Sequence, residues 1–412
     1  MVSVARARSA RRALRGVSPA FSQGSSPAIA ITHVITGLGT GGTEMTLLSL
    51  VSRFDPKRFR SRVVSLADQG TIGPLLEARG VAVAALGAWP VTRSLAGLWR
   101  LARLLRHDRP ALIQGWMSHG NVAATAGAWL AGLQCPVVWN VRQSLADLSL
   151  ERWYTAVLIR LGARWSNRAT RIIYNSQVSA QQHLAIGYSA QRAVIIPNGF
   201  DLDRFRPSTT ARAQVRRMLG LGEEALVIGH VARYHPMKGH ATLLVAASLA
   251  RNHNTPAHFV LIGHGVDSRN AAVVSMRGQL ELGERVHLLG ERADVPDLMP
   301  AFDIAVSAST RNEGVPNAVG EAMSCGVPCV VTDVGDSAML VGDCGVVVPP
   351  GDSAALAKGL EQLIALTSSA RRELGERARR RVADHFSLGH AVAQYERLYE
   401  EVLTRASSQV SR

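Results

Sequence analysis

The sequence DIAVSASTRNEGVPNAVGEA occupies residues 303–322, and it decides the fold. Its apolar start, Ile304–Ser307, has the length and composition of a buried strand. A polar loop follows, and the chain then enters a helix that contains Glu321 and Ala322. A strand, a short loop and a helix form the repeating unit of a parallel α/β sheet. We therefore predict an α/β protein.

Two carboxylates in this segment, Glu313 and Glu321, lie eight residues apart, one in the loop and one in the helix. A carboxylate accepts paired hydrogen bonds from vicinal hydroxyls, such as those of a ribose or a hexose. Backbone N–H groups at a helix N-terminus can also bind hydroxyls or phosphate. The segment that would do so here is Gly314, Val315, Pro316 and Asn317, in which every residue except the proline carries an N–H. Either glutamate alone would be an ordinary surface residue.

The same alternation of short apolar runs and helical patterns extends in both directions. Strands are predicted first at Ala28–Ile35, Arg62–Leu66, Val81–Leu86, Ala111–Gln114, Val137–Val141 and Arg171–Tyr174. A second series is predicted at Ala225–His230, His258–Ile262, Val286–Leu289, Ile304–Ser307, Val327–Thr332 and Val346–Val348. Helices are predicted at Met45–Val51, Leu95–Leu105, Val122–Ala131 and Trp153–Arg164. Two such series predict two Rossmann-like domains, each with a parallel, doubly wound sheet.

The domain boundary is predicted near residues 200–210. A turn-forming stretch, Pro197-Asn198-Gly199-Phe200-Asp201, precedes a linker at residues 206–208. We expect a disordered basic tail at 1–27, a first domain at 28–204 and a second at 205–386. A last helix within 387–412 is expected to pack back toward the first domain.

Ligands of open α/β sheets bind beyond the carboxyl ends of the strands, so the cleft between two such domains is the expected site. Arg233 and Lys238 follow the strand that ends at His230. Two fixed cations in such a loop suit a diphosphate, whose negative charge grows as it leaves. Gly263, which follows the next strand, allows a ligand to approach the backbone closely.

A glycine-rich loop, Gly37-Leu38-Gly39-Thr40-Gly41-Gly42-Thr43-Glu44, follows the first strand. Glycines let backbone N–H groups approach a phosphate at a helix N-terminus, and Gly41 and Gly42 are the candidates. The spacing is not that of a dinucleotide-binding fingerprint. A structural turn accounts for these glycines equally well.

Charge divides the chain unevenly. The formal net charge is +15, and residues 1–204 hold 24 of the 46 basic but only 9 of the 31 acidic residues. This asymmetry predicts that the first half faces an anionic surface, either a membrane or a nucleic acid. No apolar run approaches the roughly 20 residues that span a bilayer. Four cysteines without a His or Cys cluster predict no metal site.

Together these residues resemble retaining glycosyltransferase family 4, whose fold is GT-B. The resemblance covers about residues 28–405. It rests on the order and spacing of Gly41–Glu44, Ile196–Asp201, Arg233 with Lys238, Gly263–Gly265, Glu313 with Glu321, Ala322–Pro328 and Tyr395–Tyr399.

The resemblance implies a role for each matched residue. Arg233 and Lys238 would hold the donor diphosphate, Glu321 the ribose, and Glu313 with the backbone after it the donor sugar. Residues 287–294 would lie near the base. His119, just after a strand, would contact the sugar near the reacting carbon. Many members have Phe where this chain has Val315, which leaves the donor sugar open.

The resemblance also implies a reaction. The family uses a nucleoside-diphosphate sugar, retains anomeric configuration and needs no bound metal or cofactor. We expect front-face transfer of a hexose to a glycan or lipid-linked acceptor in bacterial exopolysaccharide or lipopolysaccharide synthesis. A GT-B sugar-nucleotide epimerase, or a non-catalytic protein that binds membrane or nucleic acid, are the alternatives.

The basic half suggests where the protein acts. Arg100, Arg103 and His107 share one side of a predicted helix. Arg160, Arg164, Arg168 and Arg171 have helical spacing and predict a second cationic stripe. Such stripes attract anionic lipid. We expect a cytoplasmic protein on the inner face of the membrane, and no motif supports nucleic-acid binding.

Overall fold

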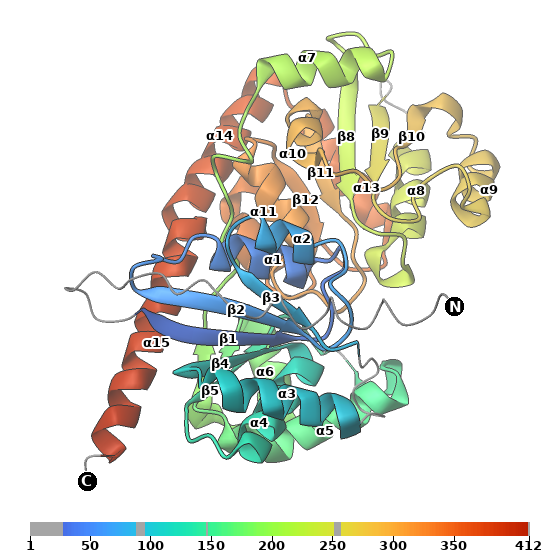
Figure 1. Cartoon of the computed structure of the whole chain (residues 1–412). Helices are drawn as coiled ribbons and strands as arrows, with labels where there is room; N and C mark the ends of the chain where they lie inside the picture. Colours follow the sequence, from blue (N-terminus) through green and yellow to red (C-terminus); the bar gives the residue numbers. More distant parts are fainter. Residues whose placement is uncertain (1–27, 88–94, 146, 251–256, 411–412) are drawn as a thin grey trace, which may run out of the picture.

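The computed structural model describes residues 28–87, 95–145, 147–250 and 257–410, so the expected basic tail at 1–27 lies outside the described residues. Two parallel sheets form the frame, and each is covered by helices on both faces (Figure 1). The expected α/β architecture of two Rossmann-like units is confirmed.

The first sheet has seven strands in the order β3-β2-β1-β4-β5-β6-β7 among the described residues. The strands are β1 Ile29–Ile35, β2 Phe59–Ser65, β3 Ala82–Ala85, β4 Leu112–Trp116, β5 Val137–Val141, β6 Arg171–Tyr174 and β7 Ala193–Ile195. Three helices pack on one face of this sheet and share a hydrophobic core with it: α1 Gly42–Val51, α2 Gly73–Glu77 and α15 Leu388–Val410. The opposite face carries α3 Leu95–Asp108, α4 Met117–Ala131, α5 Trp153–Trp165 and α6 Gln177–Ala185.

The second sheet has six described strands in the order β10-β9-β8-β11-β12-β13. They are β8 Leu226–Val231, β9 Ala257–Ile262, β10 Val286–Leu288, β11 Ile304–Ser307, β12 Cys329–Thr332 and β13 Gly345–Val348. One face packs against α7 Thr209–Met218, α10 Val295–Leu298, α11 Asn317–Ser324, α12 Ser337–Val341 and α14 Ser368–His385. The other packs against α8 His240–Leu249, α9 Ala271–Gln279 and α13 Ser353–Ile364.

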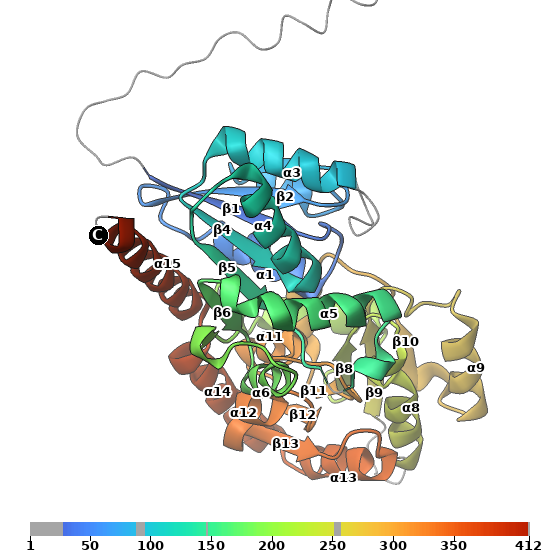
Figure 2. The same cartoon turned by 90° about the horizontal axis from the view of Figure 1, so that it is seen from below.

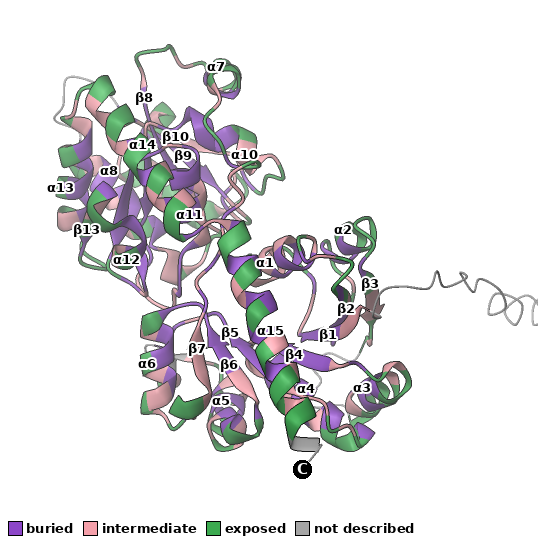
Figure 3. Ribbon diagram, turned by 90° about the vertical axis from the view of Figure 1, so that its left-hand side faces the viewer, coloured by how far each residue is buried: buried purple, intermediate pink, exposed green. Residues whose placement is uncertain are grey.

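The chain passes between the two domains at two adjacent points. Phe200 N donates to Phe386 O at 2.8 Å, and Leu388 N donates to Phe200 O at 2.8 Å. The outgoing linker and the returning chain therefore lie side by side. From there α15 runs along the first sheet, as Figure 3 shows, and buries Tyr395 and Tyr399 in the first domain's core.

One expected stripe of arginines is wrong. Helix α5 ends at Trp165, so Arg160 and Arg164 are helical, whereas Arg168 lies in a short 3-10 turn and Arg171 begins β6. The spacing looked continuous because a polar turn separates the helix from the next strand without a proline or glycine.

Strand β7, residues 193–195, was also missed, because three residues carry too little periodic signal. Among the described residues, no helix combines the length and apolar character needed to cross a bilayer.

Candidate active site

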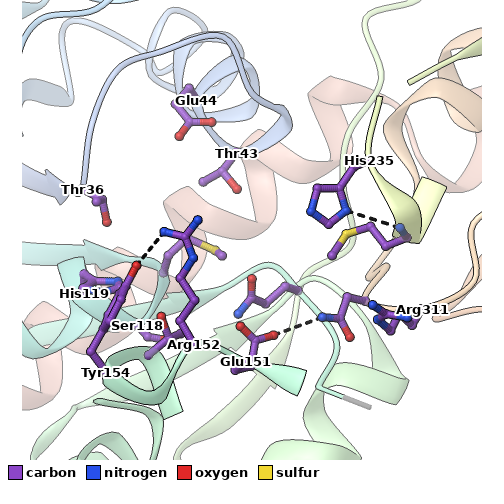
Figure 4. Close-up of a pocket in the computed structure, with 15 residues that line it drawn as sticks. Thr36, Thr43, Glu44, Ser118, His119, Glu151, Arg152, Tyr154, His235 and Arg311 are labelled. Atoms are coloured by element: carbon purple, nitrogen blue, oxygen red, sulfur yellow. Dashed lines mark hydrogen bonds between the residues drawn. The ribbon is translucent and has the colours of Figure 1, made fainter. Parts of the chain in front are cut away.

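A pocket of about 460 Å³ lies between the domains. Figure 4 shows that His119 and Tyr154 of the first domain face His235 and Arg311 of the second across it. The lining residues are Thr36, Thr43, Glu44, Met117, Ser118, His119, Gln143, Glu151, Arg152, Tyr154, Thr155, His235, Met237, Arg311 and Asn312. They come from the loops and first helical turns beyond strands β1, β4, β5, β8 and β11, the edge where a parallel sheet binds ligands.

Lys238 and Glu313 meet beside this pocket. The Lys238 ammonium donates to Glu313 Oε1, and Ser309 Oγ donates to the same oxygen at 2.6 Å. Both side chains are mostly buried, with 23% and 13% of their surface exposed. The geometry therefore brings together two residues that are 75 positions apart in the sequence.

The loop that carries Lys238 depends on a glycine. Gly239 has φ +67°, and a Cβ there would lie 1.8 Å from the carbonyl oxygen of Ala308. Only glycine fits such a close approach at positive φ. The β8–α8 loop is thereby held against the end of strand β11, which places Lys238 next to Glu313.

Positive charge gathers around the same loop. Burial lowers the pKa of His235, and the nearby charges of Arg233, Arg311 and Lys238 lower it further. An imidazole in this environment is neutral near pH 7, while the three cations around it attract an anion. Arg233 is exposed, so it is open to a ligand.

The glycine-rich loop reaches this cation cluster from the other domain. Burial raises the pKa of Glu44, whereas Arg233 and Arg142 oppose that shift, which places Glu44 within the field of both arginines. Gly41 is the extended residue before helix α1, and the Glu44 carboxylate folds back over it. Gly42 O accepts a hydrogen bond from Asn317 Nδ2 at 3.3 Å, so the loop contacts the start of α11.

His119 lies in the first turn of α4 and is half-buried at the pocket wall. Its ring tilts against Tyr154 with the ring centroids 6.4 Å apart. Burial lowers the pKa of the imidazole, so the ring is neutral at pH 7. Met117, which begins this turn, has φ +62°, a conformation that costs a non-glycine residue energy and often marks functional sites.

Glu321 does not line the pocket. It lies on α11, where burial raises the pKa of its carboxyl to about 7 and the charge of Arg204 partly opposes the shift. Val315 and Pro316 are buried, and the Val315 side chain belongs to the hydrophobic core of the second domain. The side chain of Val315 packs into the core, and its place beside the donor sugar stays a prediction.

Gly263 has a structural reason for its identity. Its φ is +151°, and a Cβ there would lie 2.1 Å from the carbonyl oxygen of Ala232. The neighbouring Tyr234 N donates to His264 O at 2.7 Å. The two loops thus support one another. Because Gly263 has no side chain, the β8 loop that carries Arg233 can lie directly against the backbone of the β9 loop.

A buried polar network between the domains was not predicted. Arg142 Nη2 donates to Asn198 Oδ1 at 2.6 Å, and Asn198 Nδ2 donates to Asn317 Oδ1 at 2.6 Å and to Val315 O at 3.0 Å. Arg142 also lies over the ring of Trp116. The sequence offered one signal, Asn198 in its turn motif, but Arg142 lies 56 residues away and Asn317 lies 119 residues away.

Another contact between the domains joins two residues that line the pocket. Asn312 Nδ2 donates to Glu151 Oε1 at 3.0 Å, a bond drawn in Figure 4. Asn312 has φ +60°, which asparagine tolerates better than most residues. In the described part of the chain, no group of three His, Cys, Asp or Glu residues is placed to hold a metal ion.

Comparison with known families identifies the chain. A model described as Glycosyltransferase Family 4 matches residues 40–204, and one described as Glycosyl transferases group 1 matches residues 225–365. The two matches fall on the first and second domains. The chain belongs to glycosyltransferase family 4.

Its relatives include the Escherichia coli UDP-Gal:alpha-D-GlcNAc-diphosphoundecaprenol alpha-1,3-galactosyltransferase. The two are 27% identical over 252 residues, which are 60% of this chain and 64% of that protein. N-acetyl-alpha-D-glucosaminyl L-malate synthase of Bacillus anthracis is 29% identical over 192 residues, 46% of this chain and 49% of the relative. The matched region thus spans about half to two thirds of these curated relatives.

Solved structures extend the similarity over the whole fold. Anabaena HepE, solved in complex with UDP-glucose, superposes with a TM-score of 0.78 at 25% sequence identity. The superposition covers 92% of this chain and all of HepE. The GT-B architecture is thereby confirmed.

Proposed function

We propose that this protein is a retaining glycosyltransferase that moves a hexose from a nucleoside-diphosphate sugar, with a UDP-hexose as the first candidate, to a hydroxyl acceptor. The observation that carries this proposal is a pocket with His119 on one wall and His235 on the other, where His235 is surrounded by the charges of Arg233 and Lys238 and Lys238 is bound to Glu313. The UDP-glucose complex of HepE supports the choice of nucleotide.

In the proposed reaction, Arg233 and Lys238 hold the diphosphate and stabilise the charge that develops as it leaves. The backbone after Glu313 orients the sugar. The acceptor hydroxyl attacks from the side on which the diphosphate departs, and a phosphate oxygen takes its proton. The C–O bond to the diphosphate breaks as the new glycosidic bond forms, and positioning supplies most of the catalysis.

Neutral His119 fits a role as a hydrogen-bonding partner of the sugar rather than a cation. Because burial keeps the ring neutral at pH 7, His119 adds no further positive charge to a wall that already carries Arg152.

We further propose that the acceptor is a lipid-linked saccharide at an anionic membrane. Helix α5 exposes Trp153, Val157, Arg160 and Arg164 at helical spacing, apolar at its start and basic at its end. Helix α3 exposes Leu95, Trp99, Arg103 and Arg106 in the same order. We call these eight residues the membrane face.

The two helices of the membrane face flank α4 on one side of the first sheet (Figure 2). The apolar residues Trp99 and Trp153 are 62% and 72% exposed. Aromatic side chains favour the interfacial zone of a bilayer, and the arginines attract anionic headgroups. Trp153 is the neighbour of Arg152 and Tyr154 at the pocket, so a bound membrane would lie near the acceptor side.

The donor is tested by incubating the protein with a panel of nucleotide sugars and following thermal unfolding, then nucleotide release. UDP-glucose or UDP-galactose should raise the unfolding temperature and be turned over slowly by water. Stabilisation by none of the nucleotide sugars would refute the proposal. An isomerised sugar without acceptor would instead indicate an epimerase.

A further inference from the structure

Asp336 links the donor domain to a helix of the other domain. It stands at the N-cap position of α12, yet its carboxylate bonds to the N-terminus of α6. Oδ1 accepts from Ser176 Oγ at 2.9 Å and from Val178 N at 3.1 Å, and Oδ2 accepts from Gln177 N at 2.7 Å. Asp336 is 5% exposed. A carboxylate of one domain thus caps a helix of the other.

Capping a helix with a charge is favourable because the first amides of a helix lack internal partners and carry partial positive charge. Ser176, the residue before α6, also accepts from Ser179 N at 3.1 Å, so its hydroxyl joins the helix to Asp336. Separating the domains would return a buried carboxylate and the α6 amides to water. The contact therefore favours one relative position of the domains.

The backbone of the same residue supports the donor loop. Asp336 N donates to Gly314 O at 2.8 Å, directly after Glu313. Gly335 has φ +61°, and a Cβ there would lie 2.3 Å from Glu313 O. On its other side, Gly314 lies so close to Asn175 that a Cβ would be 2.6 Å from Asn175 Oδ1.

The loop that carries Glu313 is therefore enclosed by Gly335–Asp336 of its own domain and by Asn175 of the first domain. We propose that Asp336 is a positioning residue that fixes this loop relative to the acceptor domain. It acts through Gly314 and helix α6. This proposal rests on the proposed function, since it assigns the acceptor to the first domain and the sugar to the Glu313 loop.

The test uses the full chain with Asp336→Ala and Asp336→Asn. Asp352→Ala is the matched control, because Asp352 caps α13 within one domain, accepting from Ala355 N at 2.9 Å. Hydrogen exchange followed by mass spectrometry measures the amides of Gln177 and Val178. Both should exchange about tenfold faster or more in the Asp336→Ala protein and at the wild-type rate in the control.

Enzymatic readouts use UDP and UDP-glucose as probes. In Asp336→Ala the Kd for UDP should stay within about twofold, because removal of a positioning contact leaves the diphosphate residues in place. Turnover of UDP-glucose should fall about tenfold or more, since small displacements of a reacting group have such effects. Asp336→Asn keeps one acceptor oxygen and should fall between wild type and Asp336→Ala.

Two outcomes would overturn the proposal. One is unchanged exchange at Gln177 and Val178 together with wild-type turnover in Asp336→Ala. The other is an equal loss of UDP affinity and turnover that Asp352→Ala shares, which would mark a general loss of stability. If the wild-type protein fails to bind UDP, the proposed donor is wrong, and the exchange rates alone then decide the role of Asp336.

Discussion

The ammonium group of Lys238 is bound to the carboxylate of Glu313, so the residue expected at the diphosphate and the residue expected at the sugar already contact each other. Ser309 holds the same carboxylate oxygen. The lysine is thus fixed before any donor arrives. A cation that is already oriented stabilises a leaving group without first paying for its own reorganisation.

Replacement of Lys238 by Met should lower the turnover of UDP-glucose by a factor of about 10² to 10³, the usual effect of removing one group that stabilises developing charge. Glu313→Gln should also lose turnover, because it releases the lysine. Nucleotide release measured at saturating donor is the assay. Lys358→Met, an exposed lysine on α13, is the control. Wild-type turnover by both site variants would refute the assignment.

His119 should affect the chemical step more than donor binding. We expect His119→Ala to reduce turnover about 10- to 100-fold, which corresponds to about 1.4 to 2.7 kcal/mol of lost hydrogen bonding, while the Kd for UDP changes little. His119→Asn should retain more activity, since its amide can still donate. His385→Ala, at an exposed site on α14, should behave as wild type.

The pH profile gives an independent test of His119. Burial lowers the pKa of the imidazole below its ordinary value of 6.5, so the neutral ring persists through pH 7 to 8 and is lost only in acid. Turnover should therefore show no step from this group between pH 7 and 8. A rise in wild-type turnover in that range that is absent from His119→Asn would contradict the neutral ring.

Glu321 predicts a pH dependence of stability. Its folded-state pKa is about 7, above the ordinary value of 4.5, so the folded protein retains a proton that the unfolded chain releases. Stability should fall as the pH rises from about 4.5 to 7 and then level off. Glu321→Gln removes this loss. Its gain in free energy of unfolding over wild type should grow from pH 5 to pH 8, by up to about 3 kcal/mol.

Denaturant unfolding of both proteins at the two pH values measures this difference. An exposed acidic residue, such as Glu376 on α14, supplies the comparison as Glu376→Gln. If the difference between wild type and Glu321→Gln is the same at pH 5 and pH 8, the pKa of the Glu321 carboxyl is not raised in the folded protein.

The membrane face predicts binding that requires both charge and aromatic rings. Sedimentation with phosphatidylcholine vesicles should be weak and should increase when phosphatidylglycerol is added. Arg103→Glu with Arg164→Glu should reduce binding about 20-fold or more, at roughly 1 kcal/mol for each charge. Trp99→Ser with Trp153→Ser should also weaken it.

Arg380→Glu, an exposed position on α14 of the second domain, is the control for a change in charge. Vesicle binding that does not depend on anionic lipid or on salt concentration would argue against the membrane face. An equal loss of binding in Arg380→Glu would argue against it as well. Such a result would leave the donor assignment intact, because the donor contacts come from the other domain.

Much of the fold could be predicted because many of its strands and helices have a recognisable local sequence pattern. The strands at 137–141, 171–174 and 304–307 were predicted with the bounds that the structure has, since each is a short apolar run between polar turns. The first turn of α4 was missed because it begins with polar and small residues, Ser118 to Asn121, that carry no helical period. The arginine stripe was wrong for the opposite reason, because its charge period continues past the end of α5 to Arg168 and Arg171.

The site was harder to predict than the fold. The sequence placed Arg233, Lys238 and Glu313 on loops at the right edge of the sheet, but their distances depend on how the two strands pair. Polar contacts across the domains, such as Asn198 with Asn317, leave no periodic pattern. Their partners become neighbours only when both domains have formed.

The return of α15 to the first sheet has a consequence for biosynthesis. Tyr395 and Tyr399 belong to the core of a domain whose other members are made at the start of translation. While the second domain is being synthesised, the part of the first domain's core that α15 covers remains exposed as an apolar strip. The first domain therefore completes its core only after nearly the whole chain has left the ribosome, and a nascent chain that stops near residue 386 exposes that strip to chaperones and proteases.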